Sequence, residues 1–402
     1  MPARCASIKE NTHLTNHLTP PRTPDFLKAA APRLIPYGTS GMLAEDYGNP
    51  AAEYAALMHG TGLIWASYRA ALKVEGKDRL KFLNHLLTQD IKTMPTGAVH
   101  YSYLLNIKGR IIADMQVLAL ADETLLDVDT RVLAPLLQTL DRYLFADDVS
   151  LQDMSAHYTR FTLAGPQSEQ ALADALPECR LPLLSAVQPY AALCGWIYRT
   201  DLLGVPTWEV AVAGSRAGDF WSHLTAATAG KPATPVGWSA FNAARIKAGL
   251  PWFGIDITDQ HLPMETGPAY HRAVHLSKGC YVGQEVVARM HSHKTVARAL
   301  MAMEFAGPVA PSAGAPLYDG EMVVGNLTSA APNPDRPGWF CAMGYVKKIH
   351  AVNGKVLAIQ MDPADGTPTD HPAGQPVDHP MDTLMDHRRR PVLLSDLAGA
   401  KN

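Results

Sequence analysis

Residues 278–285, Lys-Gly-Cys-Tyr-Val-Gly-Gln-Glu, form the most distinctive segment of this 402-residue chain. Two glycines flank the Cys-Tyr pair, and they permit a tight bend or a close approach of another part of the backbone. Lys278 and Arg289 supply positive charge near Cys280, which would favour the thiolate and prepare it for attack or for metal ligation. The residues alone leave two interpretations open. Cys280 is a functional thiol, or it is a buried spacer in a turn.

The composition indicates a folded protein with no general affinity for polyanions. Hydrophobic residues make up 47% of the chain and charged residues 18%, which is typical of a protein with a sizeable core. The formal net charge is −3, so we do not expect nucleic acid as a partner. We see neither a membrane-spanning apolar run nor a secretory signal, so we expect no membrane association, and the scattered cysteines favour a reducing cytoplasm. The five cysteines form no Cys-x-x-Cys pair, so no metal site is expected.

Hydrophobic periodicity predicts strands and helices that do not strictly alternate, which favours an α+β fold. In the first part of the chain we expect a helix over 132–140 and strands at 101–105, 111–120 and 125–128. In the second part we expect strands at 158–163 and 208–212, and helices at 166–176, 220–225 and 238–249.

The pattern changes again after residue 297. Short apolar runs separated by Gly- and Pro-rich turns predict a small antiparallel β-barrel or sandwich, with strands at 300–305, 321–327, 341–346 and 356–359. The Pro-, Asp- and His-rich tail is predicted to be disordered, so its removal after Gln360 should leave folding intact. Its three Asp-His pairs, at 370–371, 378–379 and 386–387, are interpreted as solvated low-complexity sequence, with weak metal binding as the alternative.

Two further groups of residues are candidates for chemistry. Asp90 follows an apolar helical segment, so it is either a turn residue at a helix end or an acid or base in a cleft. His291 and His293 could join Cys280 in a loose metal site, but their intervals match no zinc pattern and favour surface histidines. The chain has none of the common nucleotide-binding, zinc-protease or serine-hydrolase motifs.

The segment 278–285 resembles the signature of the YgfZ-type folate-binding proteins. These proteins are relatives of the glycine-cleavage T-protein, an aminomethyltransferase, and are implicated in the maturation of iron–sulfur proteins. The residues that carry the match are Lys278, Gly279, Cys280, Tyr281, Gly283, Gln284 and Glu285. Further segments of this chain resemble other sequence motifs of the same family. They are 74–83, 87–90, 105–109, 164–166, 199–209, 245–256, 263–265 and 325–329.

The resemblance implies a T-protein-like fold of three domains around a channel for tetrahydrofolate. It covers about residues 35–360 and leaves out both ends of the chain. We therefore expect a disordered N-terminus, two parts of the folate-binding domain, a C-terminal β-barrel and a disordered tail, with boundaries at 1–30, 31–155, 156–295, 296–360 and 361–402.

The resemblance also implies roles for individual residues. Glu209 would accept hydrogen bonds from the pterin, and Asp90 would lie beside the reactive edge of the folate, with Asn106 and Arg199 as further contacts. Leu202 and Val205 depart from the T-protein pattern, which has a tyrosine and a glutamate there. The loss of these polar groups argues against aminomethyl transfer, and the T-protein pattern also lacks Cys280.

Three functions are therefore distinguished. The first is a tetrahydrofolate-binding accessory protein for assembly or repair of iron–sulfur clusters, with Cys280 as the working thiol and with assembly machinery and client enzymes as partners. The second is a folate-dependent aminomethyltransferase or demethylase of the T-protein type, and the presence of Asp90 supports it. The third is a scaffold that has lost folate. Folate binding separates the third from the others, and turnover of an aminomethyl donor separates the second from the first.

Overall fold

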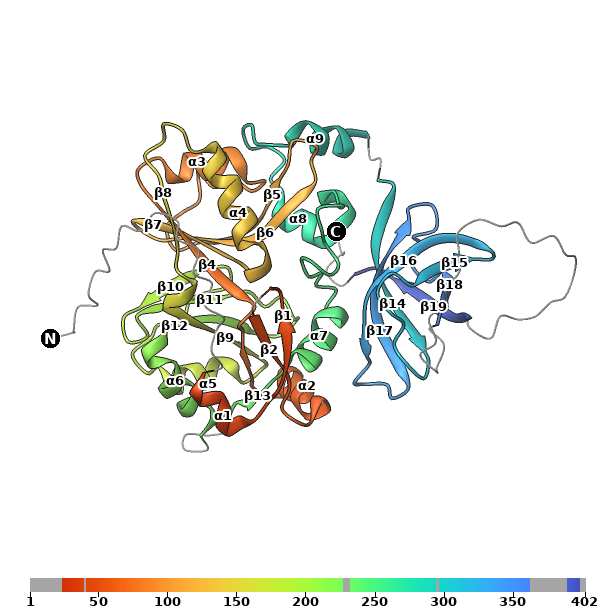
Figure 1. Ribbon diagram of the computed structural model, residues 1–402, viewed down its shortest axis with the longest axis horizontal. Helices are drawn as coiled ribbons and strands as arrows, with labels where there is room; N and C mark the ends of the chain where they lie inside the picture. The colour runs from red at the N-terminus through yellow and green to blue at the C-terminus, as the bar shows by residue number, and fades with distance from the viewer. Residues whose placement is uncertain (1–23, 40, 227–231, 294–295, 362–388, 398–402) are drawn as a thin grey trace, which may run out of the picture.

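The computed structural model describes residues 24–39, 41–226, 232–293, 296–361 and 389–397. Two β-sheets lie one above the other on one side of the molecule, and a β-barrel lies on the other side (Figure 1). The helix α7 (Trp238–Lys247) runs between the sheets and the barrel, where it contacts the barrel strands β16 (Met322–Pro332) and β17 (Trp339–Lys347) and the strand β2 (Gly41–Asp46) of a separate two-stranded sheet.

The first sheet is the upper one in Figure 1, with five antiparallel strands in the order β5-β6-β7-β4-β8. They are β4 (Arg69–Glu75), β5 (Val99–Leu105), β6 (Ile111–Ala119), β7 (Glu123–Asp129) and β8 (Ser150–Asp153). Its core includes residues of α3 (Arg79–Leu86), α4 (Thr130–Tyr143), α8 (Pro268–Ala273) and α9 (Gln284–His293). The helix α4 begins where the side chain of Asp129 accepts a hydrogen bond from the Arg131 amide, and its apolar stripe is buried.

The second sheet lies below the first and has the strand order β10-β11-β12-β9-β3-β13. Its strands are β3 (Gly62–Trp65), β9 (Tyr158–Ala164), β10 (Val187–Tyr190), β11 (Gly195–Arg199), β12 (Thr207–Ala213) and β13 (Thr234–Pro235). Its core includes residues of α1 (Asp25–Ala30), α5 (Ser168–Ala175) and α6 (Ala217–Thr225).

The two sheets pack on each other through apolar side chains and one buried carboxylate, Asp127. Asp127 accepts hydrogen bonds from Arg69 Nε at 2.7 Å and from Tyr198 Oη at 2.6 Å, and it forms an ion pair with Arg160. Burial by itself would raise the pKa of Asp127, but the charges of Arg160 and Arg69 outweigh it and lower the pKa. Because Arg160 and Tyr198 belong to the second sheet, this carboxylate ties the two sheets together.

A further core joins the second sheet to the barrel through β1 (Arg33–Tyr37), β2 (Gly41–Asp46), α2 (Pro50–His59) and α7. On α7, Arg245 forms a fully buried ion pair with Asp256. The Asp256 carboxylate also accepts hydrogen bonds from the hydroxyl groups of Thr328 and Ser329, which lie on a barrel strand. This polar cluster fixes the barrel against α7 and uses residues of two of the segments that resemble family blocks.

The barrel is closed and has the strand order β14-β17-β16-β15-β18-β19. Its strands are β14 (Arg298–Ala306), β15 (Pro316–Asp319), β16 (Met322–Pro332), β17 (Trp339–Lys347), β18 (Val356–Gln360) and β19 (Arg389–Ser395). The expected α+β fold that ends in a small antiparallel β-barrel is therefore confirmed.

Three boundaries predicted from the sequence need correction. The tail was predicted to be disordered from 361 onward, but Arg389–Ser395 forms β19 and closes the barrel. The N-terminus was predicted to be disordered through 30, but Asp25–Ala30 is helical. The boundary at residue 155 does not separate two units in space. The strand β3 pairs with β9 in the second sheet, and α8 and α9 pack on the first sheet.

None of the helices in the described part of the chain is long and apolar enough to cross a membrane. The three Asp-His pairs of the tail lie outside the described residues.

Candidate functional site

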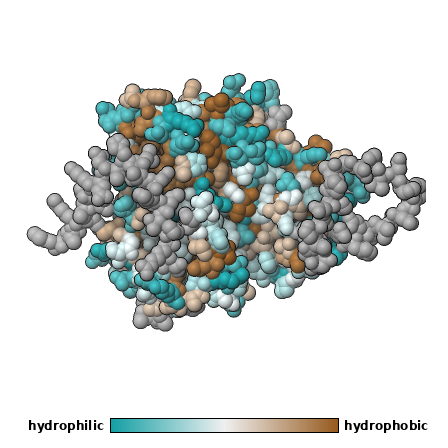
Figure 2. All heavy atoms as spheres, in the orientation of Figure 1, coloured by the Kyte–Doolittle hydropathy of each residue, from teal (hydrophilic) through white to brown (hydrophobic). Residues whose placement is uncertain are grey.

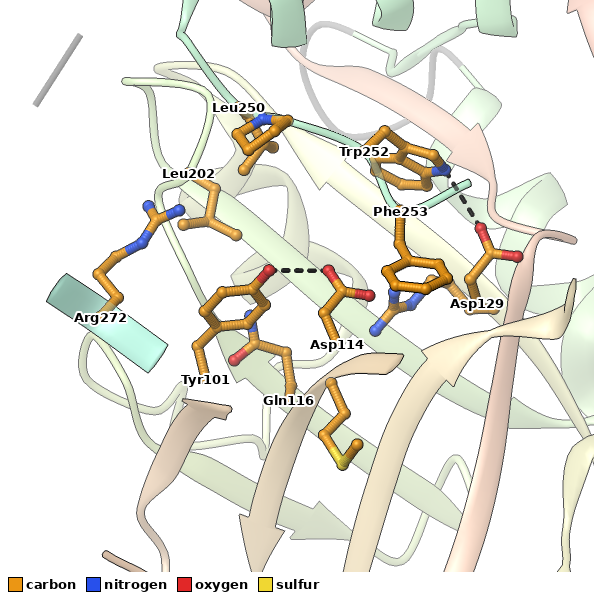
Figure 3. Close-up of a pocket in the computed structure, with 12 residues that line it drawn as sticks. Tyr101, Asp114, Gln116, Asp129, Leu202, Leu250, Trp252, Phe253 and Arg272 are labelled. Atoms are coloured by element: carbon orange, nitrogen blue, oxygen red, sulfur yellow. Dashed lines mark hydrogen bonds between the residues drawn. The ribbon is translucent and has the colours of Figure 1, made fainter. Parts of the chain in front are cut away.

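A cavity opens where the first sheet meets the loop that follows α7 (Figure 3). Its volume is about 60 Å³, which is room for a few water molecules. It is lined by Arg69, Tyr101, Asp114, Met115, Gln116, Asp129, Leu202, Leu250, Pro251, Trp252, Phe253 and Arg272. Strands, a helix and two loops from distant parts of the sequence therefore contribute to one site.

Asp114 supplies the carboxylate that points into this cavity (Figure 3). It takes a half-buried position on β6 between two buried apolar residues, and it accepts a hydrogen bond of 2.7 Å from Tyr101 Oη. Burial raises the pKa of Asp114, because the charged form loses hydration that the tyrosine only partly replaces. A carboxyl group in this state is suited to accept or donate a proton.

Arg272 connects this carboxylate to the surface. Its exposed side chain lies on α8, and the guanidinium carbon is 5.6 Å from the centre of the Tyr101 ring. Burial first, and then the charge of Asp114, raises the pKa of Tyr101, so its hydroxyl group stays protonated and acts as a donor to Asp114. Arg272, Tyr101 and Asp114 thus form a line from solvent into the cavity.

The opposite wall is held by Asp129. Arg131 donates two hydrogen bonds of 2.9 Å to this carboxylate, and Trp252 Nε1 donates one of 3.1 Å. Tyr37 also donates to Asp129, and Arg131 donates to the carbonyl group of Phe253. The loop that carries Trp252 and Phe253 is therefore fixed by charge-assisted hydrogen bonds.

Glu209 lies on β12 and does not line this cavity. Thr162 Oγ1 donates a hydrogen bond of 2.8 Å to it and is its only hydrogen-bond donor among the described residues. Burial raises the pKa of Glu209 to about 7, although the neighbouring charge of Arg69 acts in the opposite direction. Because Arg69 also lines the cavity, Glu209 belongs to the same polar region between the sheets.

Lys278 anchors the segment 278–285. Its buried ammonium donates hydrogen bonds of 2.7, 2.6 and 2.7 Å to the carbonyl groups of Asn84, Leu87 and Gln89. All three ammonium protons are used at the C-terminal end of α3, where the helix dipole favours a cation. The sequence suggested that Lys278 serves the thiol of Cys280. The structure shows that it holds the segment on α3 instead.

Tyr281 and Gly283 fix the other end of the segment. Tyr281 is buried in the core of the first sheet, and the amide of Val282 donates to the carbonyl group of His85. Gly283 has a φ of 81°, and a Cβ there would lie 2.7 Å from the carbonyl oxygen of Asn106. A side chain is therefore excluded at Gly283 both by backbone conformation and by the β5–β6 turn.

Cys280 lies between these anchors as an exposed, free cysteine. The neighbouring Gly279 is also exposed, and a Cβ there would meet nothing within 4 Å. The interpretation of Cys280 as a buried spacer is therefore wrong. The segment holds its thiol at the surface while its flanking side chains are buried.

We expect Lys278→Met to lower the free energy of unfolding by about 1.5–3 kcal/mol, because three buried carbonyl groups lose a charged donor. Urea denaturation followed by circular dichroism measures this change. Lys92→Met is the matched control, because Lys92 is exposed and its loss should cost less than about 0.5 kcal/mol. Equal effects of the two substitutions would contradict the anchoring role.

The other predicted contacts lie elsewhere. Asp90 is half-buried and accepts a hydrogen bond of 2.6 Å from Thr93, as a turn residue after α3 does. The side chain of Asn106 accepts hydrogen bonds from the amides of Lys108 and Arg110 in the β5–β6 turn. Neither Asp90 nor Asn106 lines the cavity of Figure 3.

Arg199 also stays outside this cavity. It lies at the end of β11, where its guanidinium is paired with Asp201 and lies 5.2 Å from the centre of the Trp208 ring. Gln284 and Glu285, the last residues of the motif, form the first turn of α9.

Four residues of this cavity were not predicted from the sequence: Tyr101, Asp114, Asp129 and Trp252. One signal was present, because Asp114 is the one charged residue of the predicted strand 111–120. A carboxylate at such a position costs free energy unless it is paired or used. The roles of Asp129 and Trp252 depend on contacts across more than 100 residues, which no local pattern reveals.

Comparison with known proteins identifies the family and the fold of this chain. The family model described as "GCVT N-terminal domain" matches residues 40–278, and the chain belongs to this family. The chain is similar in structure to the glycine cleavage system aminomethyltransferase T from Bartonella henselae, with a TM-score of 0.79 and 21% identity. That match covers 92% of this chain and 95% of the other, and it confirms the T-protein fold.

Curated relatives match over most of their length. The aminomethyltransferase of Streptomyces avermitilis is 29% identical over 77% of this chain and 84% of its own. The aminomethyltransferase of Thermosynechococcus vestitus is 28% identical over 85% of this chain and 91% of its own. A "putative transferase", chloroplastic, from Arabidopsis thaliana is 24% identical over 89% of this chain and 82% of its own. Aminomethyltransferases of this family use tetrahydrofolate.

Proposed function

We propose that this chain is a tetrahydrofolate-binding accessory protein of the YgfZ type, which assists the assembly or repair of iron–sulfur clusters with Cys280 as its working thiol. The observation that carries the proposal is the exposed cysteine on a segment anchored by Lys278 on one side and by Tyr281 on the other. A thiol that serves only to fill space is ordinarily buried, whereas a reactive thiol or soft-metal ligand must be accessible. Its partners would be assembly proteins and client enzymes, in the cytoplasm.

Folate binding is supported by the family and by the polar region between the sheets. Glu209 is a carboxylate with a single hydrogen-bond donor among the described residues, and such a group suits the adjacent N–H donors of a pterin. The cavity of Figure 3 is smaller than a pterin ring requires, so side chains at its edge, such as Leu202 and Arg272, would have to move. Asp90, Asn106 and Arg199 remain predicted folate contacts, each outside that cavity.

Calorimetric titration with tetrahydrofolate tests the role of Glu209. We expect Glu209→Ala to weaken binding by about 10- to 150-fold, the equivalent of about 1.5–3 kcal/mol for a hydrogen bond to a charged group. Glu178→Ala is a control, because Glu178 is an exposed glutamate just beyond α5. Unchanged affinity in Glu209→Ala would remove this residue from the site.

The same titration has a pH dependence with a definite sign. The pKa of Glu209 is raised to about 7, so the carboxylate is increasingly protonated below that pH and loses acceptor capacity. Wild-type affinity should fall by up to about tenfold between pH 8 and pH 6, and Glu209→Ala should lose this dependence. In the protein without folate, the raised pKa of Glu209 acts on the free energy of unfolding instead. Protonated Glu209 contributes to stability, and this contribution is lost as the pH rises through 7.

The second candidate is a folate-dependent aminomethyltransferase, which the names of the relatives and the Asp114–Tyr101 pair favour. For this candidate, we expect Asp114→Asn to abolish turnover of an aminomethyl donor and Asp90→Asn to leave most of it. For the accessory protein, we expect no turnover in the wild type. The measurement is formation of methylenetetrahydrofolate. If turnover were present and lost only in Asp90→Asn, the carboxylate predicted from the sequence would replace Asp114.

A further inference from the structure

Four segments meet around Cys280 on one side of the molecule, and we refer to their exposed and half-buried side chains as the Cys280 face. The segments are 81–93, 106–110, 271–280 and 284–293. The amide of His275 donates to the carbonyl group of Thr88, and Gln89 Nε2 donates to that of Arg272 at 2.8 Å. Figure 1 shows α3 and α9 along the upper side of the molecule.

The β5–β6 turn belongs to the same face. A Cβ at Gly109 would lie 2.9 Å from Val286 on α9, so the turn and the first turn of α9 are in contact. Tyr270, which precedes the third segment, forms a hydrogen bond of 3.3 Å with His291. The four segments therefore form one surface rather than separate loops.

This face has a charge opposite to that of the chain. The whole chain has 35 Lys and Arg against 38 Asp and Glu. The half-buried and exposed side chains of the four segments include two carboxylates, Asp90 and Glu285, and six permanent cations, Lys81, Lys92, Lys108, Arg110, Arg272 and Arg289. Five exposed histidines add to the positive potential when protonated: His85, His271, His275, His291 and His293.

Apolar side chains are exposed on the same face. Ile107, at the tip of the β5–β6 turn, has 78% of its surface exposed, and Leu276 has 48%. In Figure 2, hydrophilic and apolar areas lie side by side along the upper side, where Figure 1 places α3 and α9. Exposed apolar side chains within a ring of like charges are typical of a surface that binds another protein.

We propose that the Cys280 face docks an acidic protein surface and brings it against the Cys280 thiol. A net positive patch on a chain with net negative charge attracts acidic partners and repels basic ones. This inference rests on the proposed function, because it names the chemistry of the partner that the thiol would serve. Ile107 and Leu276 provide apolar contact, and the cations provide orientation and speed of association.

The test uses the full chain and three synthetic peptides. Each peptide contains one cysteine activated as a mixed disulfide with 2-thiopyridine, flanked by glutamates, glutamines or lysines. The Cys280 thiolate attacks the peptide sulfur, a new disulfide joins protein and peptide, and pyridine-2-thione leaves with the electron pair of the broken S–S bond. Absorbance of the released thione gives the rate, and Cys280→Ser gives the background from other cysteines.

We expect the glutamate peptide to react at least about tenfold faster than the lysine peptide at low salt, with the difference largely lost near 0.5 M salt. The double substitution Lys108→Glu with Arg289→Glu should remove the preference. Lys347→Glu with Lys348→Glu, on exposed residues at the end of β17 and just beyond it, should keep it.

Two results would overturn the proposal. One is an equal rate for the three peptides, or a preference that survives the Lys108 and Arg289 substitutions. The other is stronger protection of Cys280 by a single-stranded RNA oligonucleotide than by the same acidic peptide without its cysteine, which would make this a nucleic-acid surface. A charge preference together with full support of iron–sulfur enzyme activity by Cys280→Ser would separate the two proposals. It would support the docking face and contradict the proposed role of the thiol.

Discussion

A chain that ends at Gln360 is expected to lose its folded barrel, because β19 is one of the six strands that close it. Val392, Leu394 and Leu397 are buried, and each contributes about 1.5–3 kcal/mol through burial. Their loss totals on the order of 6 kcal/mol, against about 5–15 kcal/mol for the stability of a typical domain. The truncation also leaves β14 and β18 as open edges that favour aggregation.

Thermal denaturation measures this effect, and we expect the melting temperature to fall by more than about 10 °C. Two neighbouring substitutions separate the role of β19 from a general effect of shortening the chain. Leu394→Ala removes a fully buried side chain and should cost about 2–5 kcal/mol, whereas Leu393 is 48% exposed and Leu393→Ala should cost little. A truncated chain that melts like the full-length protein would show that the barrel folds without β19.

The reason that β19 was missed lies in its surroundings in the sequence. It follows a long stretch rich in Pro, Asp and His, and that composition predicts disorder over the whole tail. Only the five residues Pro391–Ser395 contain its apolar positions, and they gain a partner only when β14 and β18 are already in place. Strands such as β5, β6 and β7 were predictable because their alternation is local and their turns are short.

The interleaving of the two sheets could not be predicted for a similar reason. β3 is a short buried strand whose partner, β9, lies about 100 residues further along the chain. Periodicity identifies a strand but not its neighbour, so a division at residue 155 seemed natural. The helices α8 and α9 likewise pack on the first sheet, although they follow the second in sequence.

The candidate site was predicted only in part. Cys280 stands out in the sequence and is exposed, whereas Glu209 was expected only from the resemblance and lies on β12 beside Arg69. Asp90 and Asp114 are both carboxylates near apolar segments, and sequence reasoning chose Asp90 on the resemblance. The structure places Asp114 in the cavity and Asp90 in a turn, a distinction that depends on which face of β6 is covered by the loop after α7.

Under the proposed function, replacing Cys280 with serine is expected to abolish support of iron–sulfur enzymes while the fold stays intact. Serine has nearly the same shape, but it is a far poorer nucleophile and soft-metal ligand. Among the described residues, no hydrogen bond to the exposed Cys280 side chain is found, and Lys278 and Tyr281 hold the segment. The free energy of unfolding should therefore change by less than about 0.5 kcal/mol, and tetrahydrofolate affinity should stay the same.

Two comparison variants separate a chemical role from a structural one. Cys179→Ser changes another free cysteine, which is half-buried beside the second sheet, and should leave function intact. Gly283→Ala forces a Cβ against the carbonyl group of Asn106 at a positive φ, so it should damage the segment by distortion. If the segment were only a tight turn, Gly283→Ala would be harmful and Cys280→Ser would be harmless.

The most direct measurement is the activity of an iron–sulfur enzyme in cells that lack this protein, after complementation with the wild type or with Cys280→Ser at equal protein levels. The account predicts that the wild type restores the activity and that Cys280→Ser restores none of it, while the purified variant still folds and binds tetrahydrofolate. Full restoration by Cys280→Ser would contradict the claim that the exposed thiol is the working group of this protein.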